Sequence, residues 1–168
     1  MNRSTNGLGN TKERDNWETP DWLFELLDKQ YHFTFDCCAT KQNAKTKSFS
    51  DDFDYSPNLG CQICWMNPPF SIAKDMLQTF VLSVRRGVAI YRCDNFETEV
   101  WQIVVFPRAS WVFIPNKRIC YEGKTGGGAR FPSALIGVGL PPPKNIEGTI
   151  LIPDSYRNRR IVCGIKVE

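Results

Sequence analysis

The chain has 168 residues, of which 42% are hydrophobic and 23% are charged, and these values fit one soluble globular domain. Its net charge of +3 permits nucleic-acid binding without strongly indicating it. No apolar run is long enough to cross a bilayer, and the polar residues 1–15 lack the apolar core of a signal peptide. We therefore expect a cytoplasmic protein with a flexible segment at 1–15 and a single domain at 16–168.

The first elements in chain order are a helix and two short strands. Pro20 fits the start of a helix whose apolar residues recur at helical spacing over 22–27. The alternating segment 32–35 predicts a strand that ends at Asp36. The apolar segment 61–66 predicts a second, buried strand.

The later elements continue the alternation of strands and helices. Ser71 fits the N-cap of a helix with apolar residues at helical spacing up to Val84. Further strands are expected at 88–91, 111–114 and 133–140, a helix at 96–105, and a C-terminal β-hairpin within about 145–168. This order predicts an α/β fold with a mixed, mostly parallel sheet and helices on both faces.

The loop Asn67-Pro68-Pro69-Phe70 follows the strand at 61–66 and carries the strongest functional signal. Methylation of a planar amine requires acceptors for its two N–H groups, so that its lone pair is directed at the methyl group. The Asn67 side-chain oxygen and the Pro68 backbone carbonyl can accept these two hydrogen bonds. Neither proline has a competing N–H, and both have a fixed φ. Phe70 offers a flat face on which a flipped base can stack.

The same four residues also occur in ordinary turns. Their position between an apolar strand and a helix favours an active-site loop, because ligands of α/β sheets bind beyond the carboxyl ends of strands. Asp36 is predicted at an equivalent strand end.

Cysteines and basic residues give weaker signals. No metal site is predicted, because Cys61 and Cys64 would point to opposite faces of a strand and Cys37 directly precedes Cys38. The basic segment 117–130 surrounds three glycines and fits either a solvated loop or a contact with a phosphate backbone. Within it, Arg118 and Arg130 are our candidate DNA contacts.

Several sequence blocks, in order, resemble the phage-type DNA N6-adenine methyltransferases, the Dam-like family. The resemblance spans about residues 15–140. Its blocks are Asp15-Asn-Trp17-Glu-Thr19-Pro20 with Leu23-Phe24, Phe35-Asp36-Cys37-Cys38-Ala39, Trp65-Met-Asn67-Pro-Pro-Phe70, Tyr91-Arg-Cys-Asp94 with Trp101, Phe113-Ile-Pro-Asn-Lys-Arg118 and Phe131-Pro-Ser133-Ala134.

The resemblance implies a Rossmann-like fold, S-adenosyl-L-methionine as methyl donor, and adenine flipped from duplex DNA as substrate, in a phage or restriction-modification setting within a bacterial host. It implies catalytic roles for residues 67–70. It suggests cofactor contacts by Trp17, Thr19, Pro20, Asp36, Cys38 and Asp52.

The chain departs from the wider methyltransferase pattern at one point. The glycine-rich turn after the first strand is absent, and Cys37-Cys38-Ala39-Thr40 stands there instead. Two alternatives stay open: methylation of another planar amine, in RNA or a protein glutamine, and an inactive remnant that binds nucleic acid.

Overall fold

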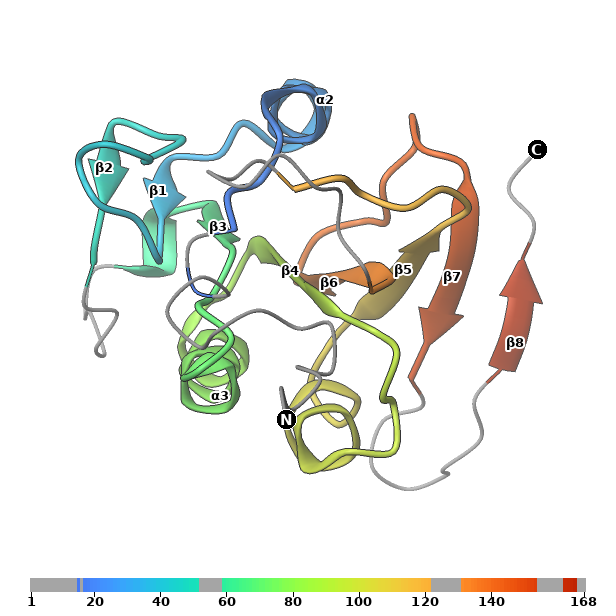
Figure 1. The fold of residues 1–168 in the computed structure, drawn as a ribbon. Helices are drawn as coiled ribbons and strands as arrows, with labels where there is room; N and C mark the ends of the chain where they lie inside the picture. Colours follow the sequence, from blue (N-terminus) through green and yellow to red (C-terminus); the bar gives the residue numbers. More distant parts are fainter. Residues whose placement is uncertain (1–14, 16, 52–58, 122–130, 154–161, 166–168) are drawn as a thin grey trace, which may run out of the picture.

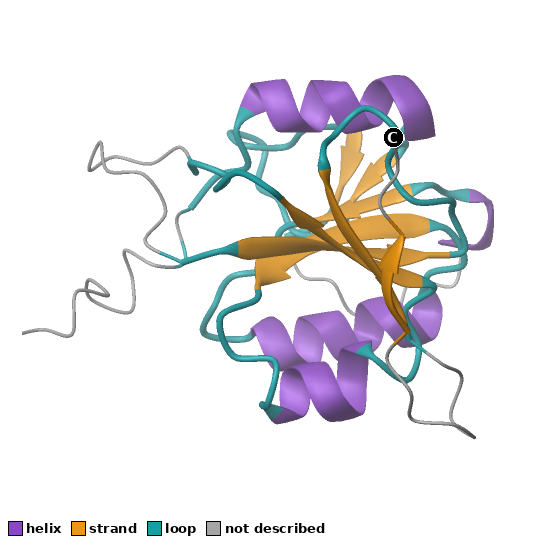
Figure 2. Ribbon diagram, turned by 90° about the vertical axis from the view of Figure 1, so that its right-hand side faces the viewer, coloured by secondary structure: helices purple, strands orange, loops and turns teal. Residues whose placement is uncertain are grey.

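The computed structural model describes residue 15 and residues 17–51, 59–121, 131–153 and 162–165. The described strands form one sheet in the order β2-β1-β3-β4-β6-β5-β7-β8. Figures 1 and 2 show helices on both of its faces, as the sequence predicts. Helix α2 (Asp21–Tyr31) covers one face, and α3 (Ala73–Ser83) and the π-helix η2 (Val100–Val105) cover the other. A short 3-10 helix, η1 (Leu59–Cys61), precedes β3.

The first half of the sheet is parallel. Strands β1 (Phe35–Asp36), β2 (Ser48–Phe49), β3 (Cys64–Met66) and β4 (Gly87–Arg92) pair in parallel, so their carboxyl ends meet at one edge. Parallel neighbours require a crossover connection, and α3 provides it between β3 and β4.

The second half of the sheet is antiparallel. It consists of β5 (Trp111–Pro115), β6 (Ser133–Val138), β7 (Gly148–Ile152) and β8 (Val162–Ile165). Strand β6 lies between β4 and β5 and runs opposite to both. The sheet is mixed, with three described parallel pairings and four antiparallel ones, so the prediction of a mostly parallel sheet holds for the first half and not for the sheet as a whole. The insertion of β6 is the reason.

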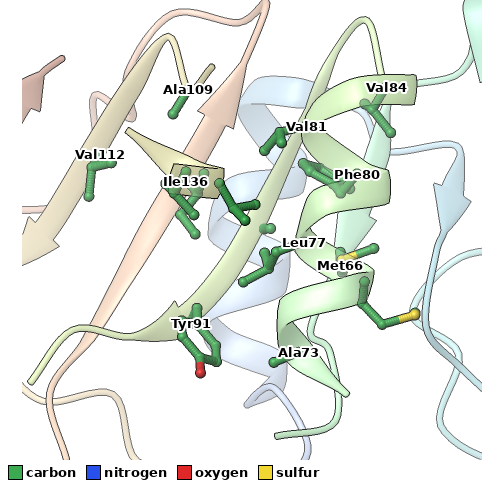
Figure 3. Close-up of a cluster of buried hydrophobic side chains, with 14 of the residues drawn as sticks. Met66, Ala73, Leu77, Phe80, Val81, Val84, Tyr91, Ala109, Val112 and Ile136 are labelled. Carbon is green, nitrogen blue, oxygen red and sulfur yellow. The ribbon is translucent and has the colours of Figure 1, made fainter. Parts of the chain in front are cut away.

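The core has two layers, one on each face of the sheet. Successive strand residues point to opposite faces. In β4, Val88 and Ile90 pack with α2, whereas Ala89 and Tyr91 pack with α3 and η2. Figure 3 shows the second layer, in which Leu77, Phe80 and Val81 of α3 lie over the strands.

The start of α3 differs from the prediction. The helix begins at Ala73, its N-cap residue is Ile72, and no side chain caps it. Ser71 therefore does not act as the N-cap. Its backbone N–H instead donates to the Asp15 carboxylate at 2.9 Å. This partner is 56 residues away in sequence, beyond the reach of a local capping rule.

Candidate active site

A cavity of about 180 Å³ opens at the carboxyl ends of β1 and β3. These strands are parallel neighbours, while β2 lies on the far side of β1, so the strand order reverses between them. Ligands of open α/β sheets bind at such a reversal. The cavity is lined by Asp15, Trp17, Glu18, Thr19, Asp36, Cys38, Ala39, Thr40, Asn43, Lys45, Asp51, Trp65, Asn67 and Pro69.

Asp36 ends β1 and is a buried residue, only 3% exposed. Its Oδ1 accepts a hydrogen bond from the Cys38 N–H at 3.2 Å, and its Oδ2 accepts one from the Lys45 N–H at 3.0 Å. Burial raises the pKa of this carboxyl, because a desolvated charge is unfavourable, and the two backbone donors and the Lys45 charge oppose the rise. A ligand with a positive charge would favour the ionised form.

Thr19 lines the same cavity, and its hydroxyl is buried. Thr19 is 2% exposed, and its Oγ1 has no hydrogen-bond partner among the described residues. A buried polar atom without a partner is destabilising by about 1–3 kcal/mol. The hydroxyl therefore suits a ligand that supplies the missing hydrogen bond.

Most of the charged groups around the cavity are acidic. Asp15, Glu18, Asp36 and Asp51 contribute carboxylates, and Lys45 is the one basic residue in its lining among the described residues. The Lys45 ammonium forms an ion pair of 2.5 Å with Asp21, outside the cavity lining. The lining therefore favours a cationic ligand.

Asn67 is fixed at the end of β3 by a contact with the segment that precedes α2. Its Nδ2 donates to the backbone oxygen of Trp17 at 2.7 Å. A carbonyl can only accept, so this contact also assigns the two ends of the amide. The Asn67 side-chain oxygen, Oδ1, is therefore not used in this contact and is left as an acceptor. Asn67 itself lines the cavity.

The two prolines after Asn67 use their carbonyls differently. The Pro69 oxygen accepts from the Ile72 N–H at 3.3 Å, in the turn that leads into α3. The Pro68 oxygen has no backbone donor among the described residues. Pro68 is buried, and neither proline has an N–H. Pro68 does not itself line the cavity, but of the two carbonyls its oxygen is the one that has no backbone donor among the described residues.

Phe70 is partly buried in an aromatic cluster. Its ring lies 5.0 Å from that of Phe131, edge to face, and 6.1 Å from that of Tyr91. The Arg92 guanidinium lies 5.2 Å from the centre of the Phe131 ring and forms a two-point ion pair with Asp94 at 2.7 and 2.6 Å. These contacts restrict the orientation of the Phe70 ring.

Comparison with known proteins identifies the family of this chain. Residues 8–122 match the family model described as DNA N-6-adenine-methyltransferase (Dam). This chain belongs to the Dam family. It is also similar to the DNA N-6-adenine-methyltransferase of Haemophilus phage HP1 (strain HP1c1), with 30% identity over 129 residues, which cover 70% of this chain and 73% of that protein. The phage-type resemblance predicted from the sequence blocks is thus confirmed.

In this Dam-family chain, six of the ten predicted site residues that the structure describes line the cavity, and Pro68 and Phe70 are not among them. Those that line the cavity are Trp17, Thr19, Asp36, Cys38, Asn67 and Pro69. Pro20 lies just outside as the buried N-cap residue of α2. Arg118 is exposed after β5 and does not line the cavity. Asp52 and Arg130 lie outside the described residues.

Several residues that line the cavity were not predicted from the sequence as site residues. Asp15 and Glu18 stand in the same block as Trp17, and this proximity could have identified them. Asn43 and Lys45 carried no signal, because they stand in a polar stretch between β1 and β2. The hydrogen bond from the Lys45 backbone to Asp36 brings that stretch to the cavity.

The segment that replaces the glycine-rich turn folds tightly around Asp36. The Cys38 N–H donates to the Asp36 carboxylate, and Ala39 is buried in the cavity wall. Burial raises the pKa of Cys38 to about 12, so its thiol is neutral at physiological pH and has little nucleophilic character. Small side chains stand where the wider pattern has glycines.

The described part of the chain shows no group of three or more His, Cys, Asp or Glu side chains that could hold a metal ion. Within the same residues, no helix has the length and apolar character needed to span a membrane.

Proposed function

We propose that this Dam-family protein transfers a methyl group from S-adenosyl-L-methionine to the N6 amine of adenine in DNA. The proposal rests on family membership and on one observation. The hydrogen bond from Asn67 Nδ2 to the Trp17 carbonyl leaves Oδ1 as a fixed acceptor beside an acidic cavity. The proposed fold is Rossmann-like, which the strand reversal between β1 and β3 supports.

The chemistry of the cavity fits this cofactor. S-adenosyl-L-methionine carries a sulfonium and an ammonium, and the lining includes Glu18, Asp36 and Asp51 besides Asp15, whose carboxylate already accepts the Ser71 N–H. We assign the ammonium to Asp36, whose buried carboxylate would gain a cationic partner, and a cofactor hydrogen bond to the unpartnered Thr19 hydroxyl. Trp17 and Cys38 would complete the wall, Pro20 would position Thr19 at the start of α2, and Asp52 would contact the cofactor ribose or adenine.

The bound cofactor supplies an electrophilic methyl group. Asn67 Oδ1 and the Pro68 oxygen accept the two N–H groups of the adenine amine, which directs its lone pair toward that methyl group. The amine would gain the methyl group as the cofactor leaves as the neutral thioether, and it would then release one proton to water. The Asn67 amide is already oriented before reaction by its contact with Trp17, so its oxygen would stabilise the positive charge that develops on the amine.

The aromatic cluster supports a role in holding the base. The exposed part of Phe70 would stack on an adenine flipped from the duplex, which contributes roughly 1–3 kcal/mol. Such stacking offsets much of the few kcal/mol needed to extrude the base. Pro69 would hold Phe70 at the cavity rim. Arg118 and Arg130 remain our proposed contacts with the DNA backbone.

The direct test incubates the protein with methyl-labelled S-adenosyl-L-methionine and unmethylated DNA, followed by nucleoside analysis for N6-methyladenine. We expect Asn67→Ala to lower kcat by at least about 100-fold, as for removal of an oriented transition-state partner. Cofactor affinity should change little. Asn145→Ala, at an exposed asparagine outside the cavity, is the matched control.

A substrate panel separates the alternatives. Label in RNA or in protein glutamine, with none in DNA, would show the same chemistry on a different planar amine. No transfer to any substrate, despite calorimetric binding of the cofactor, would contradict an active methyltransferase. Absence of cofactor binding as well would indicate a nucleic-acid-binding remnant.

A further inference from the structure

The segment before α2, which comprises residue 15 and residues 17–20, contacts both ends of the Asn67–Phe70 loop. Figure 1 shows this segment running beside β3. At one end of the loop, Asn67 Nδ2 donates to the Trp17 oxygen at 2.7 Å. Just past the other end, the Ser71 N–H donates to Asp15 Oδ1 at 2.9 Å. We propose that Asp15 is a positioning residue that holds this loop in its reactive geometry, an inference that rests on the proposed function.

The loop between the two contacts has little freedom of its own. Pro68 and Pro69 both have a fixed φ, and Pro69 restricts Pro68 to extended values of ψ, so fixing the two ends largely determines the direction of the Pro68 carbonyl. The contact from Asn67 sets one proposed acceptor of the amine. The contact from Ser71 to Asp15 sets the path of the chain after Phe70, and with it the second acceptor.

The same two segments are also linked indirectly, through the ring of Phe131, which contacts both Trp17 and Phe70. The Trp17 ring lies 6.2 Å from the Phe131 ring, and the Phe131 ring lies 5.0 Å from that of Phe70. The segment before α2 is therefore linked to the loop at three points: at Asn67, at Phe70 through the Phe131 ring, and at Ser71, just past the end of the loop. Of these contacts, the one from Asp15 uses a side chain that can be replaced without altering Trp17.

The helix that follows gives the Ser71 contact additional weight. No side chain caps α3 at Ile72, so the N–H groups before and within its first turn depend on other acceptors. A carboxylate near a helix N-terminus is also favoured by the helix dipole. Without Asp15, the Ser71 N–H would lose its acceptor and the turn after Phe70 could relax.

Asp15 also lines the cavity, so a direct contact with the cofactor is the rival role. The two roles require different properties of the side chain. A backbone N–H needs only an oxygen acceptor, which an asparagine amide supplies with nearly the same shape. A cationic cofactor needs the negative charge. Asp15→Asn and Asp15→Ala together therefore separate them.

We expect Asp15→Ala to lower kcat by roughly 10- to 100-fold, as for loss of a hydrogen bond to a charged acceptor. Its calorimetric affinity for S-adenosyl-L-methionine should change by less than about threefold, and Asp15→Asn should restore kcat to within about threefold of wild type. Asp28→Ala is the matched control. Asp28 also accepts a backbone N–H, from Phe33 at 2.7 Å, but lies outside the cavity lining.

Unchanged kcat in Asp15→Ala would overturn the proposal. An equal loss of kcat in Asp15→Asn would also overturn it, because the negative charge of Asp15 would then be needed to bind the cationic cofactor. An equal loss of kcat in Asp28→Ala would do the same, because it would show general destabilisation. Hydrogen exchange of the Ser71 amide provides a readout without catalysis, since it should accelerate in Asp15→Ala but not in Asp15→Asn. If the wild-type protein methylates nothing, the proposed function fails, and the exchange data still test the contact.

Discussion

Replacing Asn67 with aspartate should make methyl transfer strongly pH-dependent. At neutral pH, an oxygen of the introduced carboxylate would face the Trp17 carbonyl oxygen across the 2.7 Å that now joins Nδ2 to it. Two acceptors cannot share a hydrogen bond, so the side chain would turn away or the loop would shift. When protonated, the introduced carboxyl can donate to Trp17 and still present its other oxygen to the amine.

The expected pKa shift of the introduced carboxyl follows from the lost hydrogen bond to the Trp17 carbonyl. Loss of this hydrogen bond, with an acceptor left unpaired in a partly buried site, costs about 2 kcal/mol. At 1.36 kcal/mol per unit, the pKa of the introduced carboxyl should be about 1.5 units above the ordinary aspartate value of about 3.9, or near 5.4. At pH of about 7.5, roughly one molecule in 100 would then hold the reactive form.

The assay is the kcat/KM for DNA of Asn67→Asp divided by that of wild type, measured at saturating cofactor at each pH. Titration of other groups, including Asp36, affects both proteins and largely cancels. The ratio should be about 0.01 near pH 7.5 and rise about tenfold per unit of acidification until the pH nears 5.5. Asn67→Ala should give a low, flat ratio.

A flat ratio for Asn67→Asp, or one that rises with pH, would refute the reasoning. Either result would mean that the Trp17 carbonyl does not decide which end of the side chain faces the amine.

Two further predictions concern the core and the cavity. Gly137→Ala should lower the free energy of unfolding by at least about 3 kcal/mol, since its Cβ would lie 2.0 Å from Cε2 of the buried Trp111. Thermal denaturation should show a Tm at least about 6 °C lower, whereas Gly60→Ala, with no atom closer than 4.0 Å, should show little change. Calorimetric affinity for S-adenosyl-L-methionine should fall as the pH drops through the raised pKa of Asp36, because only the ionised carboxylate attracts a cation, and this loss should begin at higher pH than for an ordinary aspartate. Asp36→Asn should bind more weakly and lose most of this dependence, and an unchanged pH profile in that variant would contradict the assignment.

Local sequence pattern was sufficient to place two of the proposed site residues at the ends of strands. Asp36 and Asn67 were both predicted at the ends of apolar strands, and both line the cavity at those ends. Strand periodicity and the ends of apolar runs are properties of a few neighbouring residues, so the sequence carries them directly. The order of the motif blocks likewise indicated the family that the comparison confirmed.

Contacts between distant segments were not accessible in this way. The hydrogen bond from Ser71 to Asp15 joins residues 56 positions apart, and local capping rules assigned the start of α3 to the Ser71 side chain instead. The polar stretch that holds Lys45 showed no periodicity, yet its backbone reaches Asp36. The donor and the acceptor of each of these hydrogen bonds become neighbours only when the separate segments that carry them come together in the fold.

The sequence by itself determined the alternation of strands and helices, the strand-end positions of Asp36 and Asn67, and the family, because each is encoded in short windows or in their order. The tertiary structure alone decided that β6 enters antiparallel between β4 and β5, that Trp17 orients the Asn67 amide, and that Asp15 reaches the far end of the Asn67–Phe70 loop. The physical reason is common to all three. Strand direction and long-range hydrogen bonds depend on which segments pack together, and that choice is made by the whole core at once.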